Sequence, residues 1–491
     1  MKVTSWFGVV LVLAVACKQS GDKQRESQAK AVDLQKPVQA APADVPVTSK
    51  SPEAIRAFEQ ARDLVDHTLG DEAVEQFKRA LAADPDFAQA HAYLGSVTAG
   101  AEGVEHLAKA KALMARLPQA EQQLITAMHA QRAGDPVTAR AAYAKVLELA
   151  PGAWRADIAL AKLANAQRDS AEAIRRLDHA LTIKPDLAIA YNDLAYAHAA
   201  QREWEPAIAA ARKQVELMPK EANPHDTLGE ILLRAGKYDE AEQEFLATLA
   251  LQPRFSFAWQ GAGIARGYRG DFKGAHDAIA KRIAIGLGPA DKLDAMIDDA
   301  WVSLAEGKLG AALATLAAVD KEPGAKDVPV SAFGVLDRGQ ILTFAGRYGE
   351  ASKAYANAQQ RSEHMAGNAK RELVRRIRIG ILRNAALAGK PASDAEKLVT
   401  AFEDEAKEIG DSPELAAITA YARGLAAWAN KDLKTAIAEL QKCDVERVVC
   451  RFDLATVQRK SGDRAGAEAT EQLLRATPRR DTPTVYLLGK L

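Results

Sequence analysis

Six prolines recur through the first half of the chain at a nearly constant distance from one another. They are separated by 33, 33, 34, 34 and 34 residues, and they are Pro85, Pro118, Pro151, Pro185, Pro219 and Pro253. Because proline cannot continue a helix and also restricts the residue before it, each one ends a helical segment. A repeat of this length is typical of a stacked array in which each unit is completed only by its neighbours.

Within each unit, small and bulky apolar residues are spaced so that they share one face of a helix. Ala173, Leu177 and Ala180 precede Pro185 in this way, at separations of three, four and seven residues. Alanine at the close-contact positions lets two helices approach, and the bulky residues fill the adjoining holes. A turn rich in glycine, aspartate or lysine divides each unit into two halves, as at Gly134-Asp135. The pattern therefore predicts helical hairpins.

This pattern resembles the tetratricopeptide repeat over most of residues 51–480. The resemblance implies an all-α fold, a right-handed superhelical solenoid of about twelve helical hairpins. We expect a first block of repeats at residues 51–290 and a second block of degenerate repeats at 291–480. Residues 481–491 are expected to cap the last hairpin, because an uncovered end exposes apolar surface.

The N-terminus carries a targeting signal. Lys2 precedes an apolar run that is too short to span a bilayer, and the small residues Ala14 and Ala16 lead to Cys17. Residues 1–16 resemble a bacterial lipoprotein signal peptide, which implies acylation of Cys17 and a membrane anchor that does not span. Lys18 after the cysteine favours an outer-membrane lipoprotein that faces the periplasm. The alternative is an ordinary secretory signal, with a secreted or periplasmic protein and a free Cys17 thiol.

Residues 17–50 are rich in Gln, Ala, Pro, Lys and Asp and show little hydrophobic periodicity. Such a composition buries too little apolar surface to offset chain entropy. The sequence therefore predicts a flexible linker between the lipidated cysteine and the repeats.

Charge and motifs narrow the function classes. The chain has 65 Lys and Arg against 65 Asp and Glu. This balance argues against a nucleic-acid partner, because a protein that binds nucleic acid needs an excess of basic residues. The chain lacks a phosphate-binding loop, a nucleophile elbow and a zinc HExxH motif. His91 and His225 occupy a bulky packing position of their helices. We therefore predict no catalytic residue, metal or cofactor, and no enzyme.

Cys443 and Cys450 are the other two cysteines. If Cys17 is acylated, these two remain as an even pair in an oxidising compartment. On one continuous helix they would stand about 10.5 Å apart, beyond disulfide reach, whereas a turn between them would bring the sulfurs together. The sequence leaves open a disulfide or two buried thiols.

An arginine-rich amphipathic stretch covers residues 370–383. One interpretation is a patch for an acidic partner or for anionic headgroups. The other is an ordinary helix of the array, whose arginines pair with the acidic helix at residues 402–408.

The resemblance also implies a partner groove, lined by first-helix residues that lie away from the packing face. Carried onto this chain, the groove comprises Arg155, Ile158, Lys162, Asn165, Ile189, Asn192, Tyr196, Asn223, Asp226, Glu230, Leu233, Phe257, Gln260 and Ile264. This mixture suits an extended peptide or a helix of a protein partner. Asp226 and Glu230 argue against a clamp for a C-terminal carboxylate.

These features together favour a lipid-anchored, non-enzymatic scaffold for protein–protein interactions in the bacterial cell envelope. Assembly of a secretion, pilus or outer-membrane complex is the leading role. The alternative is an envelope adaptor in signalling or polysaccharide export, and an enzyme is the less favoured class.

Overall fold

The computed structural model describes residues 44–66, 70–322, 330–391, 394–409, 413–442 and 448–475. The predicted signal peptide, Cys17 and the predicted capping segment lie outside these residues. In the described part, the chain forms 24 α-helices, one short 3-10 helix (η1, Met114–Arg116) and no strand, which confirms the all-α prediction. None of these helices combines the length and the apolar character that a membrane crossing requires.

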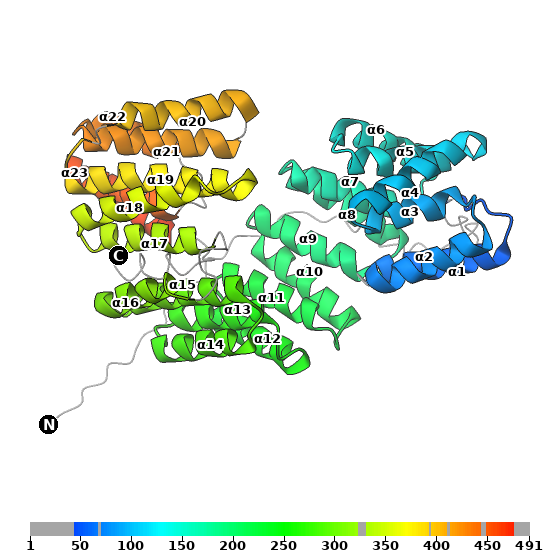
Figure 1. Ribbon diagram of the computed structural model, residues 1–491, viewed down its shortest axis with the longest axis horizontal. Helices are drawn as coiled ribbons and strands as arrows, with labels where there is room; N and C mark the ends of the chain where they lie inside the picture. The colour runs from blue at the N-terminus through cyan, green and yellow to red at the C-terminus, as the bar shows by residue number, and fades with distance from the viewer. Residues whose placement is uncertain are drawn as a thin grey trace, which may run out of the picture. The chain divides into compact units, whose positions relative to one another are not determined.

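Successive helices pair as hairpins, and the second helix of each pair packs on the first helix of the next (Figure 1). The first nine pairs are α1 (Pro52–Asp66) with α2 (Gly70–Ala83), α3 (Ala88–Val97) with α4 (Gly100–Leu113), α5 (Gln119–Arg132) with α6 (Pro136–Leu149), α7 (Trp154–Ala166) with α8 (Ser170–Ile183), α9 (Ala188–Ala200) with α10 (Trp204–Leu217), α11 (Ala222–Arg234) with α12 (Tyr238–Leu251), α13 (Ser256–Tyr268) with α14 (Phe272–Ile285), α15 (Pro289–Ala305) with α16 (Leu309–Val319) and α17 (Val330–Phe344) with α18 (Tyr348–Ser362).

The predicted turns have a common geometry. Gly134 adopts a φ of 74°, in the left-handed region that glycine tolerates best, and Asp135 then caps α6 by accepting a hydrogen bond from Thr138 N at 3.0 Å. At the turn between α7 and α8, Arg168 takes the left-handed position with a φ of 60° and Asp169 provides the cap. Each of these two turns connects its helices with three residues.

The prolines of the repeat position a ring in the following helix. In three units, the proline carbonyl oxygen contacts a ring six residues later, at 3.0 Å from His91, 3.1 Å from Tyr191 and 3.4 Å from Trp259. His91 is buried, as the packing interpretation predicts. His225 occupies the same position in its unit and bonds Glu244 at 2.7 Å.

The later repeats are less regular. The helices are α19 (Gly367–Ala388), α20 (Ala395–Ile409), α21 (Pro413–Ala429), α22 (Leu433–Leu440), α23 (Val448–Ser461) and α24 (Arg464–Arg475). α19 packs on α17, α18 and α21, and α20 packs on α21, whereas α21–α22 and α23–α24 again form hairpins. The 24 helices agree with about twelve predicted hairpins, with α19–α20 as the loosest pair.

The last hairpin returns to the centre of the later repeats. Val448 of α23 and Leu474 of α24 join a core cluster with Trp301 of α15. Arg383 of α19 donates to both carboxylate oxygens of Asp453 in α23 at 2.8 Å, and both side chains are buried. Tyr421 of α21 donates to the same carboxylate, so Asp453 connects α23 to both α19 and α21.

The arginine-rich stretch forms part of α19, and its arginines have separate partners. Arg375 pairs with Glu405 of the acidic helix at 2.8 Å, as one of the two interpretations expects. Arg383 does not, because it bonds Asp453 instead, and Arg376 lies 3.5 Å from Asp337. A solvent-facing patch of all five arginines is therefore not formed.

The boundary predicted near residue 290 lies at the start of α15, and a buried ion-pair cluster spans it. Arg282 of α14 is 2% exposed and bonds three aspartates of α15 at 2.7 to 3.0 Å, namely Asp291, Asp294 and Asp298. A buried cation with three carboxylates ties these helices together.

Residues 44–50, here named the strap, lie extended against the first hairpins. Val45 is buried in their core, Val47 and Ser49 are half-buried, and the even-numbered residues are exposed. This alternation is that of an extended segment with one face against protein. The strap belongs to the stretch for which the sequence predicts a flexible linker, and it is packed instead.

Candidate partner-binding surface

The predicted groove residues lie on α7, α9, α11 and α13, the first helices of four consecutive hairpins. Neighbouring members of this series contact one another directly. We name their side chains that face away from the second helices the inner surface. Each predicted residue lines a cavity, bonds a neighbouring helix, faces solvent or lies in the core.

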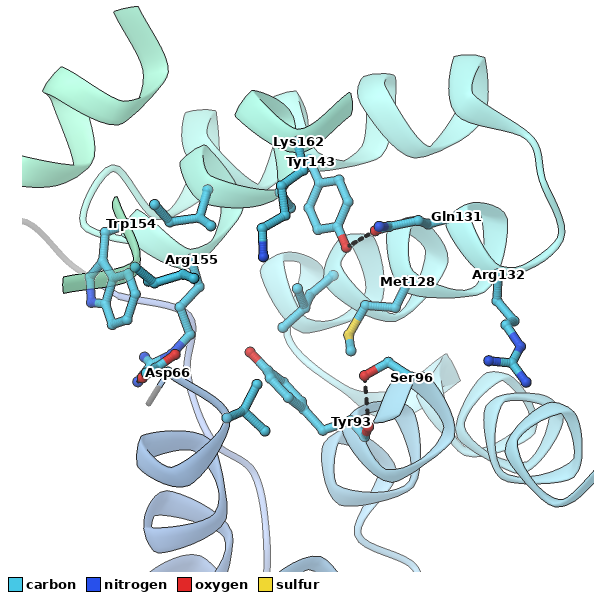
Figure 2. A pocket seen from close by; sticks show the side chains of 15 residues that line it. Asp66, Tyr93, Ser96, Met128, Gln131, Arg132, Tyr143, Trp154, Arg155 and Lys162 are labelled. Atoms are coloured by element: carbon cyan, nitrogen blue, oxygen red, sulfur yellow. Dashed lines mark hydrogen bonds and ion pairs between the residues drawn. The ribbon is translucent and has the colours of Figure 1, made fainter. Parts of the chain in front are cut away.

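A cavity of about 450 Å³ opens where α1, α3, α5 and α7 face one another (Figure 2). Of the predicted residues, Arg155, Ile158, Lys162 and Ile189 line it. Its other walls include Tyr93, Leu124, Met128, Tyr143 and Trp154, which lie outside the predicted set. Leu124 and Met128 stand 34 residues before Ile158 and Lys162, so extending the repeat register one unit back would have found both.

Arg155 closes one side of this cavity. Its guanidinium bonds Asp66, at the end of α1, at 2.6 Å, and it also stacks over the Trp154 ring with 4.0 Å to the centroid (Figure 2). Burial raises the pKa of Asp66, against the opposing effect of the Arg155 charge. This charge-assisted contact joins α7 to α1, helices three hairpins apart.

The opposite wall combines apolar and hydrogen-bonding groups. Tyr143 donates its hydroxyl to Gln131 Oε1 at 2.9 Å, and Ser96 donates to the Tyr93 carbonyl (Figure 2). Leu124, which also lines the cavity, is buried. Concave sites with apolar walls and a few oriented polar groups are typical ligand sites.

Between α9 and α11, predicted groove residues bond the neighbouring helix, and Thr227, which was not predicted, takes part. Thr227 donates to Asn192 Oδ1 at 3.1 Å, and Tyr196 donates to Glu230 Oε2 at 2.9 Å. Burial raises the pKa of the Tyr196 hydroxyl, with the Glu230 carboxylate adding to the effect. These residues therefore fix the distance between neighbouring helices as well as facing inward.

Asp226 shares this part of the surface. Its Oδ1 atom is buried and has no hydrogen-bond partner among the described residues. Burial, and to a lesser extent the nearby Glu230 carboxylate, raises the pKa of Asp226 to about 7. This carboxyl group therefore changes charge near neutral pH.

On α13, the three predicted residues have different surroundings. Phe257 is 67% exposed, Ile264 is half-buried, and Gln260 donates to Asp298 of α15 at 2.8 Å. An exposed phenylalanine on an inner surface is a candidate contact for an apolar side chain of a partner.

The three remaining predicted groove residues are Asn165, Asn223 and Leu233. Asn165 is half-buried and Asn223 is exposed. Leu233, in contrast, is 4% exposed and belongs to the hydrophobic core, so it offers no surface. The register places Leu233 on the edge of the packing face, where α11 meets its neighbours.

The predicted cysteine pair is only partly within the described residues. Cys450 is buried at the start of α23 and carries a disulfide bond. Cys443 lies outside the described residues, as does Cys17, so the pairing of Cys443 with Cys450 stays a prediction. In the described ranges, no three His, Cys, Asp or Glu side chains form a group suited to a metal ion.

Comparisons with known proteins agree with this architecture. Residues 51–101 and 126–188 match the tetratricopeptide repeat family. Similar solved structures include a tetratricopeptide repeat protein from Parabacteroides merdae at 17% identity, which covers 53% of this chain and 98% of that one with a TM-score of 0.42. They also include the type IV pilus biogenesis factor PilW at 21% identity, covering 41% and 93% with a TM-score of 0.36.

MamA is a further similar structure, at 25% identity and with a TM-score of 0.31, covering 32% of this chain and 93% of MamA. No curated protein matches the sequence. The family match and the helical hairpins both indicate tetratricopeptide repeats. Residues 51–101 and 126–188 therefore carry tetratricopeptide repeats.

Proposed function

We propose that this protein is a non-enzymatic scaffold that binds a protein partner along the inner surface of α7, α9, α11 and α13. The observation that carries the proposal is a contrast between the earlier and the later repeats. The inner surface presents exposed side chains, among them Lys162, Asn223 and Phe257. In the later repeats, Asp453 of α23 instead accepts hydrogen bonds from Arg383 of α19 and Tyr421 of α21 and is buried between them.

The chemistry of this surface favours an extended segment or a helix of the partner. Asn192 and Tyr196 are engaged between neighbouring helices, so they shape the surface more than they extend from it. Contacts with a partner then come from exposed groups such as Phe257, while the cavity beside Arg155 accepts an apolar side chain.

We place this scaffold in the bacterial envelope, held to the outer membrane by acyl chains on Cys17 and facing the periplasm. The sequence of residues 1–17 supports this placement, since a short apolar run ends in small residues before the cysteine. In that setting the partner belongs to an envelope assembly, such as a secretion, pilus or outer-membrane complex.

Photo-crosslinking tests the surface. We expect a benzophenone side chain at position 257 to crosslink to a protein partner in envelope extracts. In a separate affinity purification, Phe257→Ala, which carries no crosslinker, should recover at least tenfold less of that partner than the unaltered chain. Val137 on α6 is 77% exposed and lies on a second helix, so crosslinking and Val137→Ala at that position serve as the matched control. Equal capture at the two positions would contradict the proposed surface.

Fractionation tests the anchor. The full-length chain should incorporate a labelled fatty acid and sediment with membranes, and both properties should be lost in Cys17→Ala. Retention of Cys17→Ala in the membrane fraction would show that something other than acylation holds the protein there.

A further inference from the structure

The strap occupies the N-terminal ends of three first helices. Gln89, the second residue of α3, donates its side-chain amide to the Pro46 carbonyl oxygen. Thr48 donates its hydroxyl to Glu121, the third residue of α5. Asp44 lies 3.9 Å from Arg155, the second residue of α7. Three consecutive hairpins therefore contact one extended segment at corresponding places.

The helices contact features of the strap that another polypeptide could also present. One contact is to a main-chain carbonyl, which every peptide has, and another is to a hydroxyl on a short side chain. Gln89 also donates to Glu121 at 2.7 Å, so one amide group orients both the carboxylate and the strap. Val45 supplies the one fully buried side chain, in the core of the first hairpins.

The strap is held by Val45, by the half-buried Val47 and by polar contacts that include hydrogen bonds from the Ser49 hydroxyl and the Lys50 amide to Asp84. Only Val45 of its seven residues is buried, and the even-numbered residues remain exposed. The conformational entropy lost by ordering seven residues offsets much of what two valines and these polar contacts contribute. A competing segment with the same features can therefore displace the strap.

We propose that residues 44–50 are an intramolecular competitor, and that their seat on α3, α5 and α7 binds an extended protein segment of the same chemistry. That segment carries an acidic residue, two β-branched residues around a proline, and then a threonine or serine. The inference rests on the proposed function and adds to it: this seat adjoins the cavity at Arg155, because Asp44 of the strap lies beside that arginine.

Binding of a labelled peptide to the full-length chain tests the proposal. The probe is a fluorescein-labelled peptide of residues 42–50, and anisotropy measures its binding. Val45→Asp removes the buried valine of the strap, so this variant should bind the peptide at least tenfold more tightly than the unaltered chain. Val137→Asp makes the same change at an exposed position and should have no effect.

The seat needs its own test. Gln89→Ala, added to Val45→Asp, removes the donor to the Pro46 carbonyl and should abolish the gain in affinity. If Val45→Asp and the unaltered chain bind the peptide equally, or if neither binds it, the proposal is overturned. Circular dichroism of each variant checks that the helices remain.

Hydrogen exchange on the unaltered chain gives an independent readout. Saturating unlabelled peptide should accelerate exchange of the backbone amides at residues 47–50, and unchanged protection would overturn displacement. Capture at position 257 separates this inference from the proposed function. Partner capture without peptide binding refutes the strap's role alone, whereas peptide binding without partner capture refutes the proposed inner surface.

Discussion

Arg383 of α19 forms a buried ion pair with Asp453 of α23, 70 residues later in the chain. Tyr421 of α21 donates to the same carboxylate at 2.7 Å, and the Arg383 guanidinium lies over the Phe344 ring. One carboxylate thus connects three helices of the later repeats, and the guanidinium extends the connection to α17.

Removing one member of this pair should destabilise the later repeats strongly. Arg383→Met leaves a buried carboxylate without its cation, and we expect a loss of about 3–5 kcal/mol in the apparent free energy of unfolding. Urea titration followed by circular dichroism measures it. Arg459, on the same helix as Asp453, forms an exposed pair with Glu471, and Arg459→Ala should cost less than about 1 kcal/mol. Similar losses in both variants would contradict the special role of the buried pair.

Glycine at position 261 allows α13 to pack on α12. A methyl group there would overlap the ring of Phe245, so Gly261→Ala should lower the apparent free energy of unfolding by about 1–3 kcal/mol. Gly310 in α16 has no neighbouring atom within 4 Å of an added methyl group. Gly310→Ala should therefore stabilise its helix, by up to about 1 kcal/mol. Thermal unfolding compares the two, and the same sign for both would refute the packing argument.

The regular part of the fold was predictable because each unit carries its own signals. A proline and an apolar stripe recur through the first half of the chain, and several turns end at a capping aspartate, so local physics is enough to interpret them. The same register assigns Ile158 and Lys162 to the inner surface. It does not exclude Leu233, because burial at the edge of a packing face depends on the neighbouring helix.

Long-range contacts were not predictable from the repeat. Nothing near Arg383 in sequence indicates that it bonds Asp453 rather than the acidic helix beside it, since the return of α23 is a property of the irregular repeats. The strap was missed for a different reason. Its alternation of Val45, Val47 and Ser49 is short and interrupted by proline, and the surrounding composition is that of a linker.

The disulfide of Cys450 provides a direct test of the predicted pairing. We expect peptide mapping without reductant to find Cys450 linked to Cys443, in the unaltered chain and in Cys17→Ala alike. Closing so short a loop restricts the unfolded chain modestly, so Cys443→Ser should cost about 2 kcal/mol. A peptide that links Cys450 to Cys17 would instead show that Cys17 is not acylated.

Asp226 makes the stability of the central repeats dependent on pH. Its pKa is raised to about 7 in the folded chain, so the folded state binds a proton that the unfolded state releases near the ordinary value of 3.8. Stability therefore falls as the pH rises from about 4 to about 7, and the full cost of the buried charge is present above that window. Asp226→Asn should raise the apparent free energy of unfolding by about 1–3 kcal/mol at pH 8, and by much less at pH 4.5.

Urea titrations at these two pH values measure the difference between Asp226→Asn and the unaltered chain. Asp277 on α14 is exposed, so Asp277→Asn should change stability little and equally at both values. A gain from Asp226→Asn that is the same at pH 4.5 and pH 8 would mean that the amide acts through packing, and that the carboxyl group does not titrate in this range. A gain confined to the higher pH would show that Asp226 carries a buried, destabilising charge on the inner surface of α11 above neutral pH. A cationic group of a partner would stabilise that charge.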